Sequence, residues 1–569
     1  MTIPYMKNKF MLRLMNLISV LLILCSCTTR EHTQFVVENF SDFRLNQDSL
    51  YNYVSVALAT WKTRPWAKDY SEDVFLNYVA PPQIAYEPIE YYWISDIPKW
   101  IGFNYQGESM LQFASKINSK IEVDTRPEDW GNSQMGYSVT MSGKFGKCDD
   151  RAILTAMAMR SMGIPAAFDI IPMCGSSNNG HSFCSVIASD NTSYVYQNSA
   201  DDGMSICFEH KIPKIYRRRY FDNVAKSALR FNDNEYKPEL FNDSRLIDVT
   251  AFHRIGQRSI TIKPAEHTDK NECYLAVFHP NGWFPIAQGN LDNGYATFNN
   301  LGTGFDLDGN MTYKGDNVGE GIVYLPVLND NTPIGYPFIL STDNVYELVP
   351  SVEKEPVTLR RKFPRSRRIS MFAERMVGGI IEVANKEDFS DARQVYVIYD
   401  TPLCHVQKIA LEGDMKIRYV RFRKPMGIIS IAELAAYDFS GKKIGCSPIA
   451  CSSLQTELSL ENIQDNKPLT YLEVSRGINM WVGIDLGRPH MVSSIGFCPR
   501  NDDNDVSPGD VYELFYWDWG WKSLGEKKAE TYELVYDDVP QNALLWLRNK
   551  SKGKEERPFT YKDTEQIWW

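Results

Sequence analysis

Residues 143–170 read "GKFGKCDDRAILTAMAMRSMGIPAAFDI" and decide how the first half of the chain is interpreted. Cys148 follows two glycines and opens a run rich in Ala, Leu, Ile and Met. That composition predicts a helix, and Gly163 followed by Ile164 and Pro165 is typical of a helix end. We therefore expect Cys148 at a helix amino terminus. There the helix dipole favours a thiolate, and the free backbone N–H groups can hold an oxyanion.

A thiolate nucleophile requires a base, and the next stretch of sequence offers one. The segment "NNGHSFCSVIAS" places His181 at the start of an alternating strand, and "SYVYQNSADD" predicts a second strand with Asn198 near its end. Two adjacent antiparallel strands would bring His181 and Asn198 side by side, so that the amide orients the imidazole. A slip in strand register would give this role to Asp201 or Asp202.

Other side chains near Cys148 bear on its reactivity. Asp149 and Asp150 suit the positive end of the helix dipole but oppose a thiolate unless they point away, so the sign of their effect stays open. Trp130 and Gln134, upstream, are alternatives for an oxyanion donor or a substrate wall, with ordinary packing the simpler interpretation.

The pattern as a whole resembles the core of the transglutaminase-like superfamily: a glycine and a cysteine, a helix ending in a "GIPA" turn, a strand, then a histidine and an acidic or amide residue. The resemblance covers about 60 residues. It implies a papain-like α+β fold, with Cys148 as nucleophile, His181 as base and Asn198 as orienting residue. The family usually has Asp in the third position, and Phe183 and Tyr194 stand where tryptophans are common.

The amino terminus reads as a targeting segment that is excluded from the fold. Its charged residues precede a short apolar run, "LMNLISVLLIL", and "LCSC" follows at 24–27. This segment resembles the lipobox of bacterial lipoproteins, which implies that Cys27 is acylated and that residues 1–27 form the signal peptide. We therefore expect a bacterial cell-envelope protein, attached to a membrane by lipid, in the periplasm or on the outer-membrane surface.

The 569 residues suggest three or four domains. Residues 28–240 are predicted to hold a helical segment and the transglutaminase-like core. Short alternating runs separated by turn residues predict a β-sandwich at 245–350 and a further β-rich region at 365–569. The expected fold class is an α+β papain-like domain followed by all-β sandwich domains.

The last region resembles discoidin-type (coagulation factor type C) jelly rolls. The resemblance rests on "WVGIDLG" at 481–487 and on "RYVRFRKPMGIISIAELAAYDFSG" at 418–441. The second piece closes the family's domain but here precedes the first, so one rearranged sandwich and two sandwiches are both open. The resemblance implies binding of glycans or other surface ligands.

Charge and motifs exclude several classes of function. A net charge of -10 argues against a nucleic-acid partner, and the basic run "RRKFPRSRR" at 360–368 is interpreted as a solvated linker or hairpin. No zinc motif or phosphate-binding glycine loop occurs, so we expect no cofactor and no metal in the chemistry. Segments 500–505 and 305–310 are interpreted as polar turns, with calcium as the alternative. Four aromatics, Phe515, Trp517, Trp519 and Trp521, are expected on one strand face, as core or as a sugar platform.

Together these interpretations predict an enzyme of the cysteine peptidase or amidase type. Its substrates would be amide bonds of peptides, glycopeptides or peptidoglycan, with hydrolysis favoured over cross-linking and with β-sandwich modules holding a substrate or glycan. The alternative is a surface lipoprotein that binds glycans or proteins on a degenerate, non-catalytic core.

Overall fold

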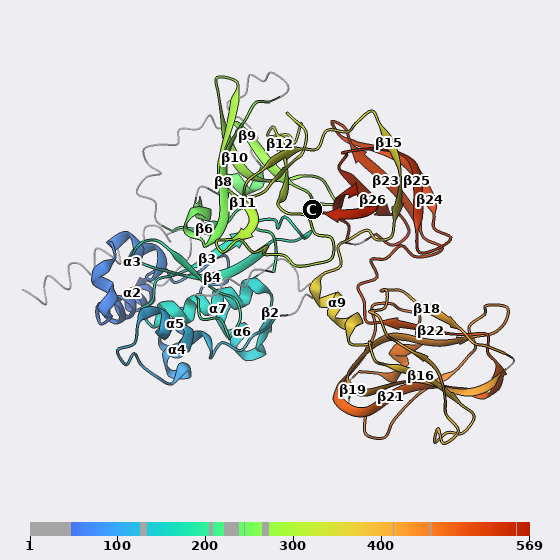
Figure 1. Ribbon diagram of the computed structural model, residues 1–569. Helices are drawn as coiled ribbons and strands as arrows, with labels where there is room; N and C mark the ends of the chain where they lie inside the picture. Colours follow the sequence, from blue (N-terminus) through green and yellow to red (C-terminus); the bar gives the residue numbers. More distant parts are fainter. Residues whose placement is uncertain are drawn as a thin grey trace, which may run out of the picture. The chain divides into compact units, whose positions relative to one another are not determined.

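The computed structural model describes residues 47–125, 134–203, 209–220, 238–243, 245–264, 272–413, 415–454, 456, 458–553 and 555–569. Residues 1–27, which were interpreted as a signal peptide and include Cys27, lie outside these residues, and so does Trp130. The chain forms two compact units (Figure 1). The first contains the described residues up to Tyr313 and Glu320–Glu347, and the second contains Lys314–Gly319 and Leu348–Trp569. The fold is mixed α and β with mostly strands, arranged in several sheets.

The first unit begins with a group of helices, of which α2, α4, α5 and α6 contact α7. Their bounds are α2 (Gln47–Lys62), η1 (Pro65–Asp69), α3 (Glu72–Tyr78), α4 (Trp93–Ile101), α5 (Met110–Asn118), α6 (Tyr137–Gly143) and α7 (Cys148–Ser161). Every residue of α7 from Asp150 onward is buried, as expected for a central helix rather than an amphipathic surface helix. Gly163 ends the helix in a left-handed conformation, with φ 74°.

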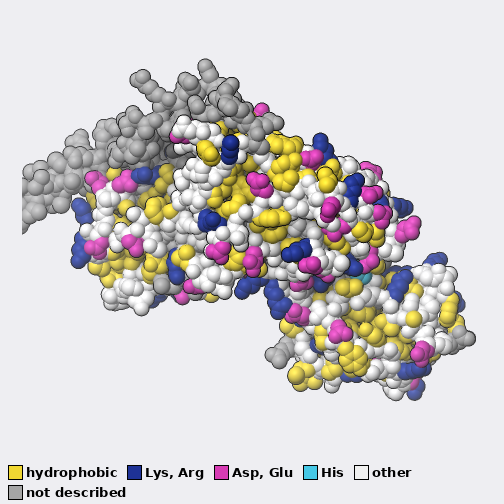
Figure 2. Space-filling model, turned by 45° about the horizontal axis from the view of Figure 1, so that its top comes forward, with side chains coloured by type: hydrophobic (Ala, Val, Ile, Leu, Met, Phe, Trp, Pro, Cys, Tyr) yellow, Lys and Arg dark blue, Asp and Glu magenta, His cyan; other side chains and the backbone are white. Residues whose placement is uncertain are grey.

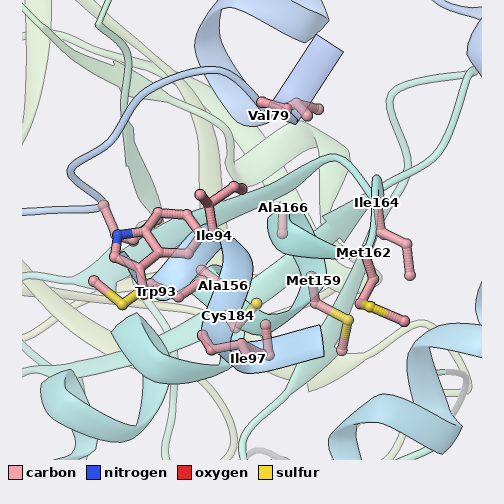
Figure 3. Close-up of a cluster of buried hydrophobic side chains, with 14 of the residues drawn as sticks. Val79, Trp93, Ile94, Ile97, Ala156, Met159, Met162, Ile164, Ala166 and Cys184 are labelled. Atoms are coloured by element: carbon pink, nitrogen blue, oxygen red, sulfur yellow. The ribbon is translucent and has the colours of Figure 1, made fainter. Parts of the chain in front are cut away.

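One hydrophobic core joins these helices to an antiparallel sheet with strand order β5-β4-β3-β6-β7. Figure 3 shows Trp93 and Ile97 of α4 and Met159 of α7 around Cys184 of the sheet. The strands are β3 (Ala166–Ile171), β4 (His181–Ile187), β5 (Ser193–Tyr196), β6 (Tyr216–Arg218) and β7 (Leu246–Asp248). A short parallel pair, β1 (Asp124–Thr125) and β2 (Phe145–Gly146), precedes α7. The helix–strand–strand order expected around Cys148 is therefore present.

A seven-stranded sheet completes the first unit, in the order β14-β13-β12-β9-β10-β11-β8. This sheet packs directly against the segment that carries β6. The Tyr216 hydroxyl donates to the Ile286 carbonyl at 2.7 Å, and the Gly302 N–H donates to the Pro213 carbonyl at 2.9 Å. Its elements are η2 (Glu239–Asn242), η3 (Thr250–Phe252), β8 (Ile255–Ile262), β9 (Glu272–Val277), β10 (Phe284–Asp292), β11 (Tyr295–Asp306), β12 (Ile322–Val327), β13 (Phe338–Leu340) and β14 (Val345–Glu347).

The expected boundary between 240 and 245 therefore falls inside one unit. Residues just after it form β7, which pairs with β6 of the first sheet. The β-rich stretch predicted at 245–350 is present as strands, but its first strand belongs to the sheet that carries His181.

In the second unit, the two segments quoted above, 418–441 and 481–487, contribute to one hydrophobic core that includes Val420, Phe422 and Ile484. The motif strands are the long neighbours β19 and β21, which pair antiparallel in one sheet with order β17-β16-β19-β21-β20, while β22 pairs with both β18 and β19. The elements are α9 (Arg367–Glu374), β16 (Ile380–Ala384), β17 (Arg393–Val397), β18 (Gln407–Ala410), β19 (Lys416–Tyr437), β20 (Ser447–Ala450), η4 (Leu460–Ile463), β21 (Leu472–Met491) and β22 (Ser494–Pro499).

A separate core in the second unit joins β15 (Lys354–Leu359) to the last strands of the chain. These are β23 (Val511–Trp517), β24 (Trp521–Lys528), β25 (Leu534–Pro540), β26 (Leu545–Asn549), β27 (Pro558–Lys562) and β28 (Glu565–Trp568). Because β15 pairs with β25, and the Gly319 N–H donates to the Trp568 carbonyl at 2.9 Å, the expected boundary at residue 365 leaves out two segments of this unit.

Candidate active site

Cys148 is the first residue of α7, and the turn before it is held by Asp150. One carboxylate oxygen of Asp150 accepts the Lys147 N–H at 2.8 Å, and the other accepts the Met135 N–H at 2.7 Å. A Cβ on Gly146 would lie 2.7 Å from the Asp150 Cβ, so the glycine is required for this close packing. Asp150 therefore fixes the amino end of the helix, and with it the position of the half-buried thiol.

His181 begins β4 and faces the same cavity as Cys148, and its interaction with the thiol helps to set the pKa of Cys148. The thiol Sγ lies 3.7 Å from the Asp149 carboxylate. Burial raises the pKa of Cys148, but the hydrogen bond and charge of His181 and the Ser182 hydroxyl outweigh it and leave that pKa below its ordinary value. Burial lowers the pKa of His181, but its contacts with Cys148 and Gln197 outweigh burial and raise it. Both directions favour the thiolate–imidazolium pair.

The His181 ring has Gln197 as its partner, where Asn198 was expected. Its Nε2 lies 2.7 Å from the Gln197 Oε1, which leaves Nδ1 for the thiol. In the β4–β5 ladder Cys184 pairs with Tyr196 and Ser185 with Val195, so odd-numbered residues of both strands share one face. Continued past Tyr196, this register places residue 197 on the face of His181 and residue 198 on the other.

Asn198 lines the same cavity but is exposed and is held by its backbone. Its N–H donates to the Asp201 carboxylate at 2.7 Å, and its carbonyl accepts from the Asn118 amide at 2.6 Å. The second alternative, Asp201, also accepts the Gln197 N–H at 2.6 Å, so this carboxylate closes the turn after β5. The carbonyl of the third, Asp202, accepts from the Ser115 and Tyr196 hydroxyls at 3.1 and 3.3 Å.

Arg151 joins the helix that carries the thiol to the segment that carries Gln197. It lies one turn after Cys148, and its guanidinium donates to the backbone carbonyls of Gln197 and Ile121 and to the Ser199 hydroxyl. A buried guanidinium that satisfies carbonyls from two other segments restricts the movement of α7 relative to β5. The sequence pattern gave no sign of this residue, because its partners are backbone atoms.

Asp149 and Gln134, the two further candidates near the thiol, form a hydrogen bond with each other. The Asp149 carboxylate accepts from the Ser182 hydroxyl and from the Gln134 amide, the latter at 3.1 Å. The Gln134 carbonyl oxygen accepts the Tyr86 N–H at 2.7 Å. Gln134 thus orients Asp149. The charge of Asp149 raises the pKa of Cys148 and so opposes the thiolate. This effect is smaller than the lowering of that pKa by His181 and Ser182.

A cavity of about 200 Å³ opens onto the thiol. Its walls include Cys148, His181, Gln197 and Asn198, together with Glu209 and His210. The thiol, the imidazole and the amide that contacts the imidazole therefore face one space that can hold part of a bound molecule.

A second histidine cluster lies behind this site and was missed in the sequence. Asp169 of β3 is fully buried and forms a double hydrogen bond with Arg217, both distances being 2.7 Å. His253 Nε2 lies 2.9 Å from the same carboxylate. The Phe183 ring lies near both histidines, with its centroid 6.2 Å from that of His181 and 5.6 Å from that of His253.

In both segments for which calcium was the alternative, carboxylates already have protein partners. In 500–505, Asp502 and Asp505 both form ion pairs with Arg361. In 305–310, Asp306 accepts the N–H groups of Asp308 and Asn310 at 2.9 Å, which is a polar turn. Among the described residues no group of three or more His, Cys, Asp or Glu side chains is arranged to hold a metal ion.

Two other sequence interpretations are corrected. The basic run 360–368 is not simply a solvated linker, because Arg361 and Lys362 are buried. The four aromatics do not share one strand face, because β23 ends at Trp517, β24 begins at Trp521, and Trp519 lies in the turn between them with φ 54°. The ring centroids of Trp517 and Trp521 lie 5.2 Å apart.

Within the described part of the chain, no helix combines the length and the apolar character needed to cross a membrane. In comparisons with family models and with curated proteins, nothing matches this chain.

Proposed function

We propose that the chain is a cysteine hydrolase of the transglutaminase-like type that cleaves amide bonds. The observation that supports this proposal best is the contact of the Cys148 thiol at a helix amino terminus with His181, whose second nitrogen is held by Gln197 at 2.7 Å. The order of α7, β3, β4 and β5 agrees with the family pattern and with a papain-like fold. Gln197 takes the position of the orienting residue.

The chemistry follows from the protonation states. The Cys148 thiolate attacks the amide carbonyl carbon, and the first N–H groups of α7, which have no partner within the helix, stabilise the oxyanion. The His181 imidazolium gives its proton to the leaving amine as the C–N bond breaks. A water molecule, deprotonated by His181, then attacks the thioester and releases a carboxylic acid and the thiol.

The substrate is proposed to be a peptide, glycopeptide or peptidoglycan fragment presented outside the cytoplasm. The lipobox-like segment motivates a lipid anchor on Cys27, and the β-rich second unit is assigned to substrate or glycan binding. On the face that Figure 2 shows, basic and acidic side chains are interspersed, without a broad basic patch among the described residues. Together with the net charge of -10, this distribution makes the face shown unfavourable for nucleic acid.

Thiol labelling tests the reactive pair directly. Iodoacetamide should modify Cys148 of the wild-type chain well below the ordinary pKa of a thiol, and His181→Gln should move the labelling profile to higher pH. Peptide mapping identifies the labelled residue, and the buried Cys184, whose pKa is raised by burial, is the internal control. Labelling of Cys148 only in the ordinary thiol range would favour the non-catalytic, glycan- or protein-binding alternative.

Turnover is then sought with peptides, glycopeptides and peptidoglycan fragments, with release of the amine as readout. Hydrolysis gives a free acid, whereas transfer to an added amine gives a new amide, so mass spectrometry of the products distinguishes the two reactions. A wild-type chain with a reactive Cys148 and no turnover on any of these would contradict the proposed substrate class.

The membrane anchor has a separate test. Cys27→Ala should prevent acylation and leave the chain unprocessed or released from the membrane fraction. Unchanged processing and membrane retention would contradict the lipoprotein proposal without affecting the proposal for Cys148.

A further inference from the structure

A second cavity, of about 600 Å³, lies within the second unit. Its walls include His405, Asp505, Tyr532, Arg365, Asp316 and Glu533. These residues come from several segments of the unit, among them Lys314–Gly319 and the loop after β22. The volume is within the range of small-molecule sites.

His405 is held in one orientation on two sides. Its Nδ1 lies 3.0 Å from the Asp505 carboxylate, and its ring stacks on Tyr532 with centroids 3.8 Å apart and planes at 11°. The Arg361 guanidinium holds Asp505 and Asp502 from the other side. Burial raises the pKa of Asp505, but Arg361 and the His405 hydrogen bond lower it below its ordinary value, so the carboxylate is ionised.

The contact of Nδ1 with the Asp505 carboxylate determines which hydrogen bond Nε2 of His405 can form. The tautomer that fits this contact carries its proton on Nδ1 and a lone pair on Nε2. Among the described residues Nε2 of His405 has no hydrogen-bond partner. The imidazole therefore offers the cavity an oriented acceptor for a hydroxyl.

The charges of the cavity walls define the class of ligand. Arg360 is paired with Glu533 at 2.7 Å, Arg361 with Asp505, and Arg365 lies 3.5 Å from Asp316. No cation of the wall remains in excess, so the site is poorly suited to phosphate or to acidic sugars. The carboxylates accept hydrogen bonds from hydroxyls.

Arg365 supplies a donor as well as a charge. Its Nε is buried and has no hydrogen-bond partner among the described residues. A buried donor without a partner is costly, so a ligand oxygen that reorders this side chain would be stabilised. Oriented acceptors and an unsatisfied donor around one cavity match a ligand with many hydroxyl groups.

We propose that this cavity binds a neutral saccharide, with the Nε2 of His405 accepting a hydrogen bond from a sugar hydroxyl. The proposal gives a location to the glycan-binding role of the second unit and does not depend on Cys148.

Isothermal titration of the full chain with cellobiose, chitobiose, lactose and mannobiose tests the proposal. At least one should bind saturably. His405→Asn keeps an amide N–H for Asp505 but removes Nε2, so it should weaken binding at least about tenfold. His490→Asn is the matched control, because His490 belongs to the same unit and does not line the cavity. It should bind as the wild type does.

Thermal melts accompany the titrations. If His405→Asn lowers the melting temperature, Arg365→Lys, which keeps the charge beside Asp316 and removes the Nε donor, takes its place and should also weaken binding. The absence of binding by all four disaccharides, or equal affinity of these variants and the wild type, would overturn the proposal. Preference for glucuronic acid or inorganic phosphate, lost in His405→Asn, would overturn the neutral class. None of these outcomes bears on amide hydrolysis.

Discussion

His181 and His253 both lie near the Phe183 ring, yet their environments differ in almost every respect. His181 faces a cavity, contacts a thiol, and has a neutral amide, Gln197, as its partner. His253 is buried and contacts the Asp169 carboxylate, which it shares with Arg217. The pKa of His181 is raised by its partners, whereas burial lowers the pKa of His253 despite Asp169.

The two histidines differ in the properties that the proposed chemistry requires. A carboxylate partner is the feature that a search for a triad would favour, and here it belongs to the buried cluster. Access to a cavity and contact with a nucleophile belong to the histidine with the weaker, uncharged partner. The Asp169 carboxylate beside His253 is already paired with Arg217, so this cluster is suited to holding the sheet together.

The largest expected effect tests the reactive side of the comparison. Cys148→Ala should lower turnover by at least about 10⁴-fold, because the remaining residues cannot form the acyl intermediate. Its melting temperature should stay within about 2 °C of the wild type, since the thiol packs at the rim of a cavity. Retained activity in the variant, measured on any substrate identified, would remove the thiol from the chemistry.

Asp169→Asn tests the buried side. It keeps the shape of the side chain but leaves the Arg217 charge without a counterion, so the free energy of unfolding should fall by about 3–5 kcal/mol. Urea unfolding followed by circular dichroism measures the loss. The fraction that remains folded should keep its kcat. A specific loss of kcat at unchanged stability would show that the two histidine clusters are coupled across Phe183.

Gln197→Ala and Asn198→Ala form a matched pair at adjacent positions. Gln197→Ala should lower kcat/KM by about 10–100-fold and move the alkaline limb of its pH profile to lower pH, because the imidazolium loses its acceptor. Asn198→Ala should stay within about threefold of the wild type, since the contacts of Asn198 are made by its backbone. The reverse result would restore Asn198 as the orienting residue.

The smallest effect concerns acid stability. Because the folded chain keeps the pKa of His253 below its ordinary value, the unfolded chain binds more protons there, and stability falls as the pH drops below about 6.5. A single such group contributes at most about 1.4 kcal/mol per pH unit. Urea unfolding at pH 7.5 and 5.5 should show a shallower pH dependence for His253→Gln. An equal dependence would assign the loss to other groups.

Much of the region around Cys148 could be predicted from the sequence. Composition and stop signals placed the helix, and alternation placed β4 and β5, because these features depend on local preferences. The partner of His181 depends on strand register, and a shift of one residue exchanges Gln197 for Asn198. Neither residue type nor spacing determines that register.

The remaining discrepancies come from contacts between segments far apart in sequence. Arg151 binds backbone carbonyls, which no motif records. The Asp169–Arg217–His253 cluster joins β3, β6 and the residue after η3, which are distant in sequence. Near the expected boundaries at 240–245 and 365, β7 and β15 pair with strands from other parts of the chain, and such pairings leave no local signal in the sequence.

The short segment Lys314–Gly319 has a consequence for how this protein can be divided or recombined. It belongs to the second unit and is bonded to Trp568, although the residues on both sides of it belong to the first unit. The chain therefore passes between the units three times. A protease cut after Glu347 would leave this segment on the amino-terminal fragment, still paired with the carboxyl-terminal one. Neither unit is a contiguous cassette, so exchange of modules by a single crossover would break one of them.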